Sequence, residues 1–261
     1  MLSYFLESEF DGKKRIELLR KLYSDDSSNN IYLLFAGRAS QEAGDIKEAF
    51  ESFRLSAMQN PRNSKALFEL ANMYSASNQL DVAEMLLEIV HEEENEDSEV
   101  LLTLGNLDFA KRNYSKALKL YKRALHNQPW NFSLLNHIAE CYRQTGNYEK
   151  ALHYFKKSLC LNSKQSDVLL RMAEICRQTD QLDRALKYYD LATELDELSK
   201  ESLMGHIYCL IQSAEPRRAL ELLNRIESDD YDVVFARATC EYLTGNYEGA
   251  IRLYTQLKLM Q

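Results

Sequence analysis

The most regular feature of the chain is a pair of apolar positions that recurs at a fixed interval. An alanine is followed four residues later by a large apolar residue, and residues four apart share one face of a helix. Successive alanines are 34 residues apart over five intervals and 31 apart over the last. The pairs are Ala49/Phe53, Ala83/Leu87, Ala117/Tyr121, Ala151/Phe155, Ala185/Tyr189, Ala219/Leu223 and Ala250/Tyr254. The pattern predicts one helix at the same place in each repeated unit.

A second helix is predicted ahead of each alanine. Gly44, Gly146 and Gly245 stand where a glycine favours the left-handed end of a helix. A small residue also recurs twelve positions before the alanine, where it allows two helices to approach closely. These small residues are Gly37, Ala71, Gly105, Ala139, Ala173 and Ala238. Each unit is therefore predicted to be a hairpin of two closely packed helices.

The repeat resembles the tetratricopeptide repeat family. Residues 132–165 carry the resemblance through Ile138-Ala139, Tyr142, Gly146, Tyr148, Ala151 and Phe155. Residues 98–131 carry it through Leu104-Gly105, Tyr114, Ala117, Tyr121, Ala124 and Pro129. The resemblance implies an all-α fold, a right-handed α-solenoid of stacked helix-turn-helix hairpins. It also implies that the first helices line a concave groove and the second helices form the convex back.

The repeat spacing divides the chain into a half-unit and seven units. Residues 1–29 are expected to form an N-terminal capping half-repeat, in which Arg15 takes the place of the alanine. The sixth unit departs most from the pattern, with His206-Ile207 in its first helix and Pro216 at the start of its second. The predicted units are 30–63, 64–97, 98–131, 132–165, 166–199, 200–230 and 231–261.

No polar capping helix follows the last predicted unit, which ends at Gln261. An uncapped apolar end is unusual for a soluble solenoid. We therefore expect that the natural chain continues, or that a partner or a second copy of the chain covers this face.

Composition supports a helical, soluble protein. The chain has 3 prolines and 8 glycines in 261 residues, and it has no apolar run long enough for a membrane span. The N-terminus places carboxylates where a secretory signal would place positive charge. Its 5 cysteines form no close pair, and an odd count favours reduced thiols. We expect a cytoplasmic protein that does not enter membranes.

The net charge of −8 disfavours nucleic acid as a partner, because nucleic-acid-binding surfaces are positive. Residues 30–97 are strongly acidic, whereas residues 98–199 are weakly basic. Lysines and arginines gather around the predicted second helix of the third unit and at Lys156 and Lys157 of the fourth. They are Lys111, Arg112, Lys116, Lys119, Lys122 and Arg123. Such a stripe is most often a solvated face, and RNA binding through it is the least favoured function.

No sequence motif for catalysis, cofactor binding or metal binding is present. His137 and Cys141 lie one helical turn apart, but no further ligands converge on them. Cys141, Cys209 and Cys240 share one repeat position, which is predicted to point inward. We therefore expect a protein that is not an enzyme and that has no cofactor and no metal.

The predicted site is a peptide-binding groove along the first helices. One row runs Arg38, Asn72, Asn106, Glu140 and Glu174, and Asn136 belongs to a parallel row with Leu34, Phe68, Leu102 and Leu170. The asparagines of these rows are candidates for peptide binding because an amide side chain can both donate a hydrogen bond to an extended peptide backbone and accept one from it. The alternative is that the apolar row packs under neighbouring helices and the asparagines are solvated. The candidate peptide-binding residues are Arg38, Asn72, Asn106, Asn136, Glu140, Arg143, Arg171, Glu174 and Arg177.

These features predict a scaffold or adaptor that binds a peptide segment or a helix of a partner protein. A subclass of the family binds the acidic tails of chaperones and requires a lysine early in a first helix. This chain has Leu34, Phe68 and Leu102 at that position, so we do not expect it to bind such tails. A regulatory or substrate-presenting domain of a longer enzyme is the alternative. Self-association through the uncapped C-terminal face is a further expectation.

Overall fold

The computed structural model describes residues 12–26, 30–93, 97–195 and 199–259, and these residues form fifteen helices and no strand. The chain divides into two compact units, Met1–Pro129 and Trp130–Gln261. The first unit contains α2 (Gly12–Asp25), α3 (Ile31–Glu42), α4 (Ile46–Gln59), α5 (Ser64–Ala76), α6 (Leu80–Glu93), α7 (Ser98–Ala110) and α8 (Tyr114–Asn127). The second unit contains α9 (Phe132–Gln144), α10 (Tyr148–Leu161), α11 (Ser166–Gln178), α12 (Leu182–Leu195), α13 (Lys200–Gln212), α14 (Pro216–Leu223), α15 (Tyr231–Leu243) and α16 (Tyr247–Leu259).

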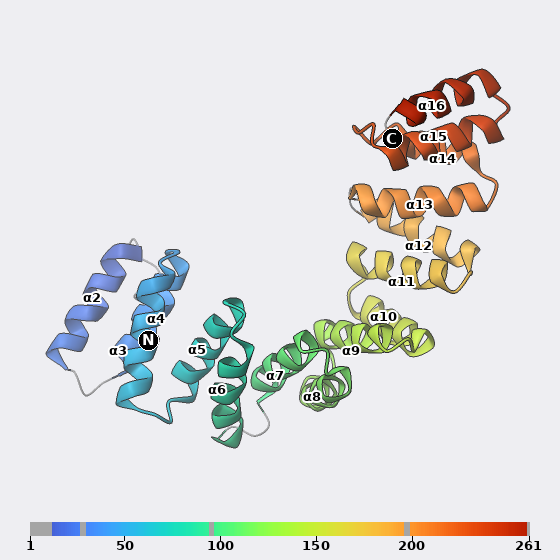
Figure 1. Cartoon of the computed structure of the whole chain (residues 1–261). Coiled ribbons are helices and arrows are strands. Elements are labelled where there is room, and N and C mark those ends of the chain that lie inside the picture. The colour runs from blue at the N-terminus through green and yellow to red at the C-terminus, as the bar shows by residue number, and fades with distance from the viewer. Residues whose placement is uncertain (1–11, 27–29, 94–96, 196–198, 260–261) are drawn as a thin grey trace. The chain divides into compact units, whose positions relative to one another are not determined.

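Within each unit the helices pair into hairpins that stack on one another (Figure 1). In the first unit α3 packs on α4, α5 on α6 and α7 on α8, with α2 packed against α3. In the second unit the hairpins are α9/α10, α11/α12, α13/α14 and α15/α16. The second helix of a hairpin also contacts the first helix of the next one, as α10 contacts α11. The predicted all-α solenoid of stacked hairpins is confirmed.

The alanine and aromatic positions form the hairpin interfaces. Ala151 and Phe155 are completely buried, and the other six alanines of the pattern are at most 2% exposed. A Cβ added at Gly37 would lie 2.5 Å from the ring of Phe53. Small residues are therefore required at this contact because the ring of the second helix packs directly on the backbone of the first.

The turn inside each hairpin repeats one backbone conformation. Gly44, Gly146 and Gly245 have φ angles of 79°, 74° and 86°, so their predicted left-handed conformation is confirmed. The same position in the other hairpins is also left-handed, although it carries a side chain there. These residues are Asn78, Arg112, Asp180 and Ala214, with φ between 57° and 62°. The turn geometry is thus set by the hairpin and not by glycine alone.

Asparagine side chains begin several helices. The Asn63 side chain accepts a hydrogen bond from the backbone N–H of Ala66 at α5, and Asn131 accepts one from Leu134 at α9. Such bonds satisfy N–H groups that have no partner within the helix. They fix the starts of α5 and α9 relative to the preceding residues.

The sixth hairpin is the irregular one, as its sequence predicts. Its second helix, α14, has 8 residues, whereas α12 has 14. Pro216 is the first residue of α14, where a missing N–H costs nothing. His206 in α13 is 2% exposed and lies in the core of this hairpin.

Candidate protein-binding groove

A groove of about 550 Å³ lies along the first helices of the second unit. Its walls come from α9, α11 and α13, with Tyr189 of α12 at the base. We call it the Arg171 groove. It is lined by four of the predicted residues, Arg143, Arg171, Glu174 and Arg177, and by Leu170, Tyr189, Glu201, Ser202, Met204, Gly205 and Tyr208.

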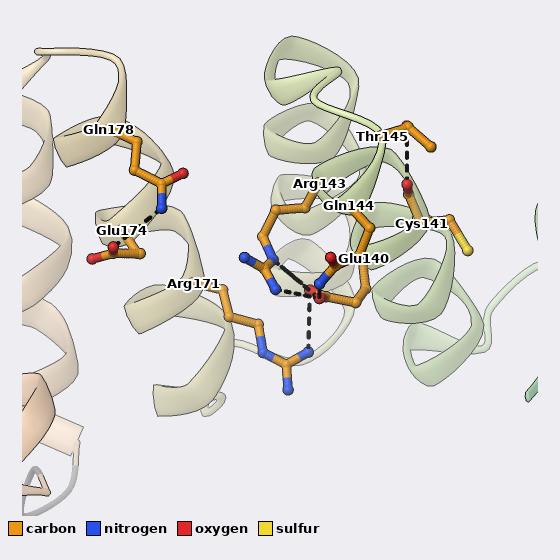
Figure 2. A network of polar contacts seen from close by, with 8 residues as sticks. All are labelled: Glu140, Cys141, Arg143, Gln144, Thr145, Arg171, Glu174 and Gln178. Atoms are coloured by element: carbon orange, nitrogen blue, oxygen red, sulfur yellow. Dashed lines mark hydrogen bonds and ion pairs between the residues drawn. The ribbon is translucent and has the colours of Figure 1, made fainter. Parts of the chain in front are cut away.

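Glu140 is the centre of a network of ionic hydrogen bonds beside this groove (Figure 2). Arg143 donates to its carboxylate over 2.6–3.0 Å, and Gln144 donates over 2.8 Å. Arg171 reaches the same carboxylate from α11, with its Nη1 3.8 Å from Glu140 Oε2. Burial alone would raise the pKa of Glu140, but the bonds from Arg143 and Gln144 outweigh it and hold the pKa below its usual value. Glu140 is therefore ionised at neutral pH.

Glu174 repeats this arrangement on α11. Arg177 donates to it over 2.5 and 2.9 Å, and Gln178 donates over 3.3 Å. The bond from Arg177 lowers the pKa of Glu174, although burial opposes this. The Tyr189 hydroxyl also donates to Glu174, over 3.3 Å. Arg143 and Arg177 are thus each held by a carboxylate of their own helix.

Arg171 is held less tightly than the other two arginines. Its side chain is 47% exposed, and its ion pair with Glu140 is long. A guanidinium has five N–H donors in a planar fork, so most of the donors of Arg171 face the groove and water. It is the group in the groove that is best placed to bind an acceptor on another molecule.

Asn136 has a different environment from the one its row predicts. Its Nδ2 donates to Gln165 Oε1 over 2.8 Å, and Gln165 in turn donates to the Ser158 hydroxyl and the Asn162 carbonyl. The Asn136 Oδ1 is buried and has no hydrogen-bond partner among the described residues. Asn136 therefore contributes to the joint between the hairpins, and it does not line the Arg171 groove.

Three predicted residues belong to the first unit. Arg38 pairs with Glu69 over 3.0 Å and lines a small pocket of about 150 Å³. Asn106 accepts a hydrogen bond from the Tyr121 hydroxyl over 2.8 Å. Asn72 is half-buried, and the described part of the chain shows no hydrogen bond to its amide. Of the apolar row, Leu34 is buried, while Phe68 is only partly buried.

In three hairpins the hydroxyl of a second-helix tyrosine forms a hydrogen bond with a first-helix residue 15 positions earlier, a contact that was not predicted from the sequence. These bonds join Tyr121 to Asn106, Tyr189 to Glu174 and Tyr254 to Thr239. The aromatic ring of the second helix passes under the first helix, so its hydroxyl emerges at the groove row. The interval of 15 residues is visible in the sequence and could have been used to find these contacts.

The basic stripe is partly neutralised within the first unit. Lys111 forms ion pairs with Asp81, over 2.7 Å, and with Glu84, both on α6. Lys116 and Lys119 are exposed on α8. Lys156 and Lys157 belong to the second unit. The local charge is thus less positive than the sequence alone indicates.

The cysteines that share a repeat position do point inward. Cys141, Cys209 and Cys240 are at most 1% exposed, and burial raises the pKa of Cys141 to about 12. Cys160 is exposed. Within the described ranges no three histidine, cysteine or acidic side chains are grouped so that they could hold a metal ion. None of the described helices is long and apolar enough to cross a membrane.

Comparison with known proteins agrees with this geometry. Residues 98–161 and 142–201 match two tetratricopeptide repeat family models. A stretch of 102 residues is 31% identical to tetratricopeptide repeat protein 21A of Mus musculus, and it makes up 39% of this chain but 8% of that protein. The stacked hairpins define an α-solenoid. Residues 98–201 are therefore tetratricopeptide repeats.

Solved structures show the same fold. A structure of pilF from Pseudomonas aeruginosa matches with a TM-score of 0.66 at 18% identity, covering 88% of this chain and 98% of that one. YrrB, described as a TPR protein with an unusual peptide-binding site, matches with a TM-score of 0.56 at 18% identity, covering 79% of this chain and 100% of that one. At such identities the likeness concerns the fold alone.

Proposed function

We propose that the chain is a non-enzymatic scaffold whose second unit binds an extended segment or a helix of another protein in the Arg171 groove. The observation that carries the proposal is the position of Arg171. Its half-exposed guanidinium faces a groove of about 550 Å³ built by the first helices of three successive hairpins. Neighbouring arginines are already paired with carboxylates, so Arg171 is the donor that a partner can use.

The walls of the groove suit a polypeptide better than a small polar molecule. Leu170, Met204 and Tyr208 offer apolar surface, while Arg171 and Glu201 offer opposite charges at separate points. An interface with an apolar centre and charged groups that fix register is typical of peptide recognition. YrrB, which has the same fold, carries a peptide-binding site, and this also supports the proposal.

The proposal can be tested by site-specific photo-crosslinking in cells that express the chain. Benzoylphenylalanine would replace Tyr208 inside the groove or, as a matched control, Lys187 on the exposed side of α12. We expect position 208 to capture a defined protein that position 187 does not capture. Equal capture at both positions, or capture at 187 alone, would place the binding surface outside the groove.

The first unit offers a second segment of the same kind of surface. Asn72 is half-buried with a free amide among the described residues, and it lies on α5 in the predicted row. We propose that it contacts a segment of a partner protein at the first unit. A regulatory or substrate-presenting role within a longer protein remains compatible with this scaffold function.

A separate observation favours self-association through α15 and α16. Tyr254 is 39% exposed, whereas Phe155 and Tyr189 at the same repeat position are 0% and 3% exposed. Ile251 is 65% exposed, whereas Leu152 and Leu186 at its position are 7% exposed. Sedimentation of the wild type and Ile251→Glu tests this: a concentration-dependent dimer that Ile251→Glu abolishes supports it, and a wild-type monomer at all concentrations contradicts it.

A further inference from the structure

An imidazole occupies a core position that the first five hairpins fill with an apolar side chain and the seventh fills with Arg237. His206 stands thirteen residues before the alanine of its unit. The same position carries Leu70, Leu104, Ile138 and Met172, all of them buried. His206 is equally buried, at 2% exposure. The irregular sixth hairpin therefore places two ring nitrogens where the repeat requires none.

The ring nitrogens of His206 are poorly satisfied. Neither Nδ1 nor Nε2 has a hydrogen-bond partner among the described residues. Asp190 Oδ1 lies 3.4 Å from Nε2, but the geometry does not make a hydrogen bond. Arg218 already donates to both oxygens of Asp190, over 2.8 and 3.0 Å. The ring packs instead as an aromatic surface against Tyr189, with centroids 5.2 Å apart.

Charged groups on two helices face this position. Asp190 and Glu194 come from α12, and Glu215, Arg218 and Glu221 come from the start and body of α14, with Arg225 just beyond it. Burial, the largest influence, lowers the pKa of His206, and Arg218 lowers it further. Asp190 and Glu215 oppose this shift without overcoming it.

Water has a route to this site once the helices separate slightly. A groove of about 510 Å³ lies between α12 and α14, and His206 and Leu210 of α13 are among its lining residues. The short α14 packs on α13 over a smaller interface than the other second helices form with their first helices. The hairpin that encloses the imidazole is therefore held together by less helix-to-helix packing than its neighbours.

We propose that protonation of His206 weakens the packing of the α13–α14 hairpin against α12. A neutral ring packs in the core, whereas an imidazolium needs acceptors for two N–H groups. Asp190 and water supply those acceptors only when α12 and α14 move apart. This inference concerns the hairpin itself and stands whether or not the Arg171 groove binds a partner.

The sign of the effect follows from the lowered pKa. The closed hairpin binds the proton less readily than the open one, whose histidine titrates near the ordinary value of 6.5. The stability that depends on the neutral ring is therefore present above that pH. It is lost as the pH falls from there through the lower pKa of the closed state.

Amide hydrogen exchange tests the proposal on the whole chain at about pH 7.5 and about pH 5.5, with intrinsic rates corrected. The lower pH lies about one unit below the ordinary histidine pKa, so protonation of the open state can favour opening by up to about tenfold. We therefore expect α13–α14 to lose more protection than α9–α10 on acidification, by a factor of up to about ten. His206→Met, which restores the residue of the Met172 position, should remove the difference. Equal losses in α13–α14 and α9–α10 of the wild type, or an unchanged response in His206→Met, would overturn it.

A second variant keeps the test decisive if His206→Met does not fold. Asp190→Asn removes a carboxylate that raises the pKa of His206 in the closed hairpin. The closed and open states should then differ more in pKa, so acidification should cost α13–α14 more protection than in the wild type. Nuclear magnetic resonance of the His206 ring should show a pKa below the ordinary histidine value of 6.5, because burial lowers it. A pKa of His206 at or above 6.5, or an acid-induced loss of protection in Asp190→Asn no greater than in the wild type, would refute the proposal.

Discussion

The ring of Tyr189 stacks on the ring of His206, with centroids 5.2 Å apart and planes inclined by 10°. The hydroxyl of the same tyrosine donates a hydrogen bond to Glu174 at the edge of the Arg171 groove. One side chain of a second helix thus contacts the core of the sixth hairpin and the surface of the fifth. Groove geometry and hairpin packing are therefore connected through Tyr189.

Gly205→Ala should reveal how tightly Tyr189 packs. An added Cβ would lie 2.6 Å from the Tyr189 hydroxyl oxygen, and such overpacking costs about 1–3 kcal/mol. We expect a lower free energy of unfolding, measured by urea denaturation. In a Tyr189→Phe background the closest contact is removed, so the same substitution should cost clearly less. A cost that is unchanged by Tyr189→Phe would show that the hydroxyl is not the obstacle.

The left-handed turn positions make a paired prediction. A non-glycine residue in this conformation carries a steric cost of about 1–2 kcal/mol, part of which the greater backbone entropy of glycine offsets. Ala214→Gly should therefore stabilise the chain modestly, by up to about 1 kcal/mol. Gly146→Ala, the reverse change at the equivalent turn, should destabilise it. Thermal unfolding of both variants measures this, and shifts of the same sign would contradict the account.

Asn72 and Asn106 should behave differently despite their equivalent repeat positions. Asn106→Ala removes the acceptor for the buried Tyr121 hydroxyl, and a lost hydrogen bond to a buried group costs about 1–3 kcal/mol. Asn72→Ala breaks no hydrogen bond that the structure shows, so its free energy of unfolding should change little. Denaturant titration of each variant provides the measurement. If Asn72→Ala is the more destabilising of the two, its amide supports the fold and is not available for a partner.

The cysteines should differ sharply in reactivity. A thiol reagent reacts with the thiolate, and burial raises the pKa of Cys209 and Cys240 to about 11. The exposed Cys160 should be modified first, and the four buried thiols should react only as the chain unfolds. Mass spectrometry of the chain after brief maleimide treatment checks this. Early modification of Cys141 or Cys176 would show that their hairpins open under native conditions.

The hairpin interfaces could be predicted from the sequence because they depend on a strict period. Ala151 and Phe155 are identified by spacing alone, and the structure buries both completely. The turn conformation could be predicted only where it carries glycine. Arg112 and Ala214 adopt it because the surrounding hairpin imposes it, and nothing in their own side chains indicates this.

The groove was only partly predictable. Arg143, Arg171, Glu174 and Arg177 line it as their helix positions indicate. Asn136 lies in the same rows, but its side chain bonds to Gln165 of the next hairpin. This contact joins side chains 29 residues apart in different hairpins, and the helical periodicity within one unit does not predict it. His206 was visible as an irregularity, but its neighbour Asp190 was not.

The central claim is that a partner protein is held in the groove through Arg171. The most direct measurement is isothermal titration of a peptide carrying the crosslinked segment, with the wild type, Arg171→Ala and the control Lys187→Ala. A charge-assisted hydrogen bond contributes about 1.5–3 kcal/mol, so Arg171→Ala should weaken binding about tenfold or more while both variants keep the wild-type stability. Lys187→Ala should bind as the wild type does. Unchanged affinity in Arg171→Ala, or a loss confined to Lys187→Ala, would contradict the claim.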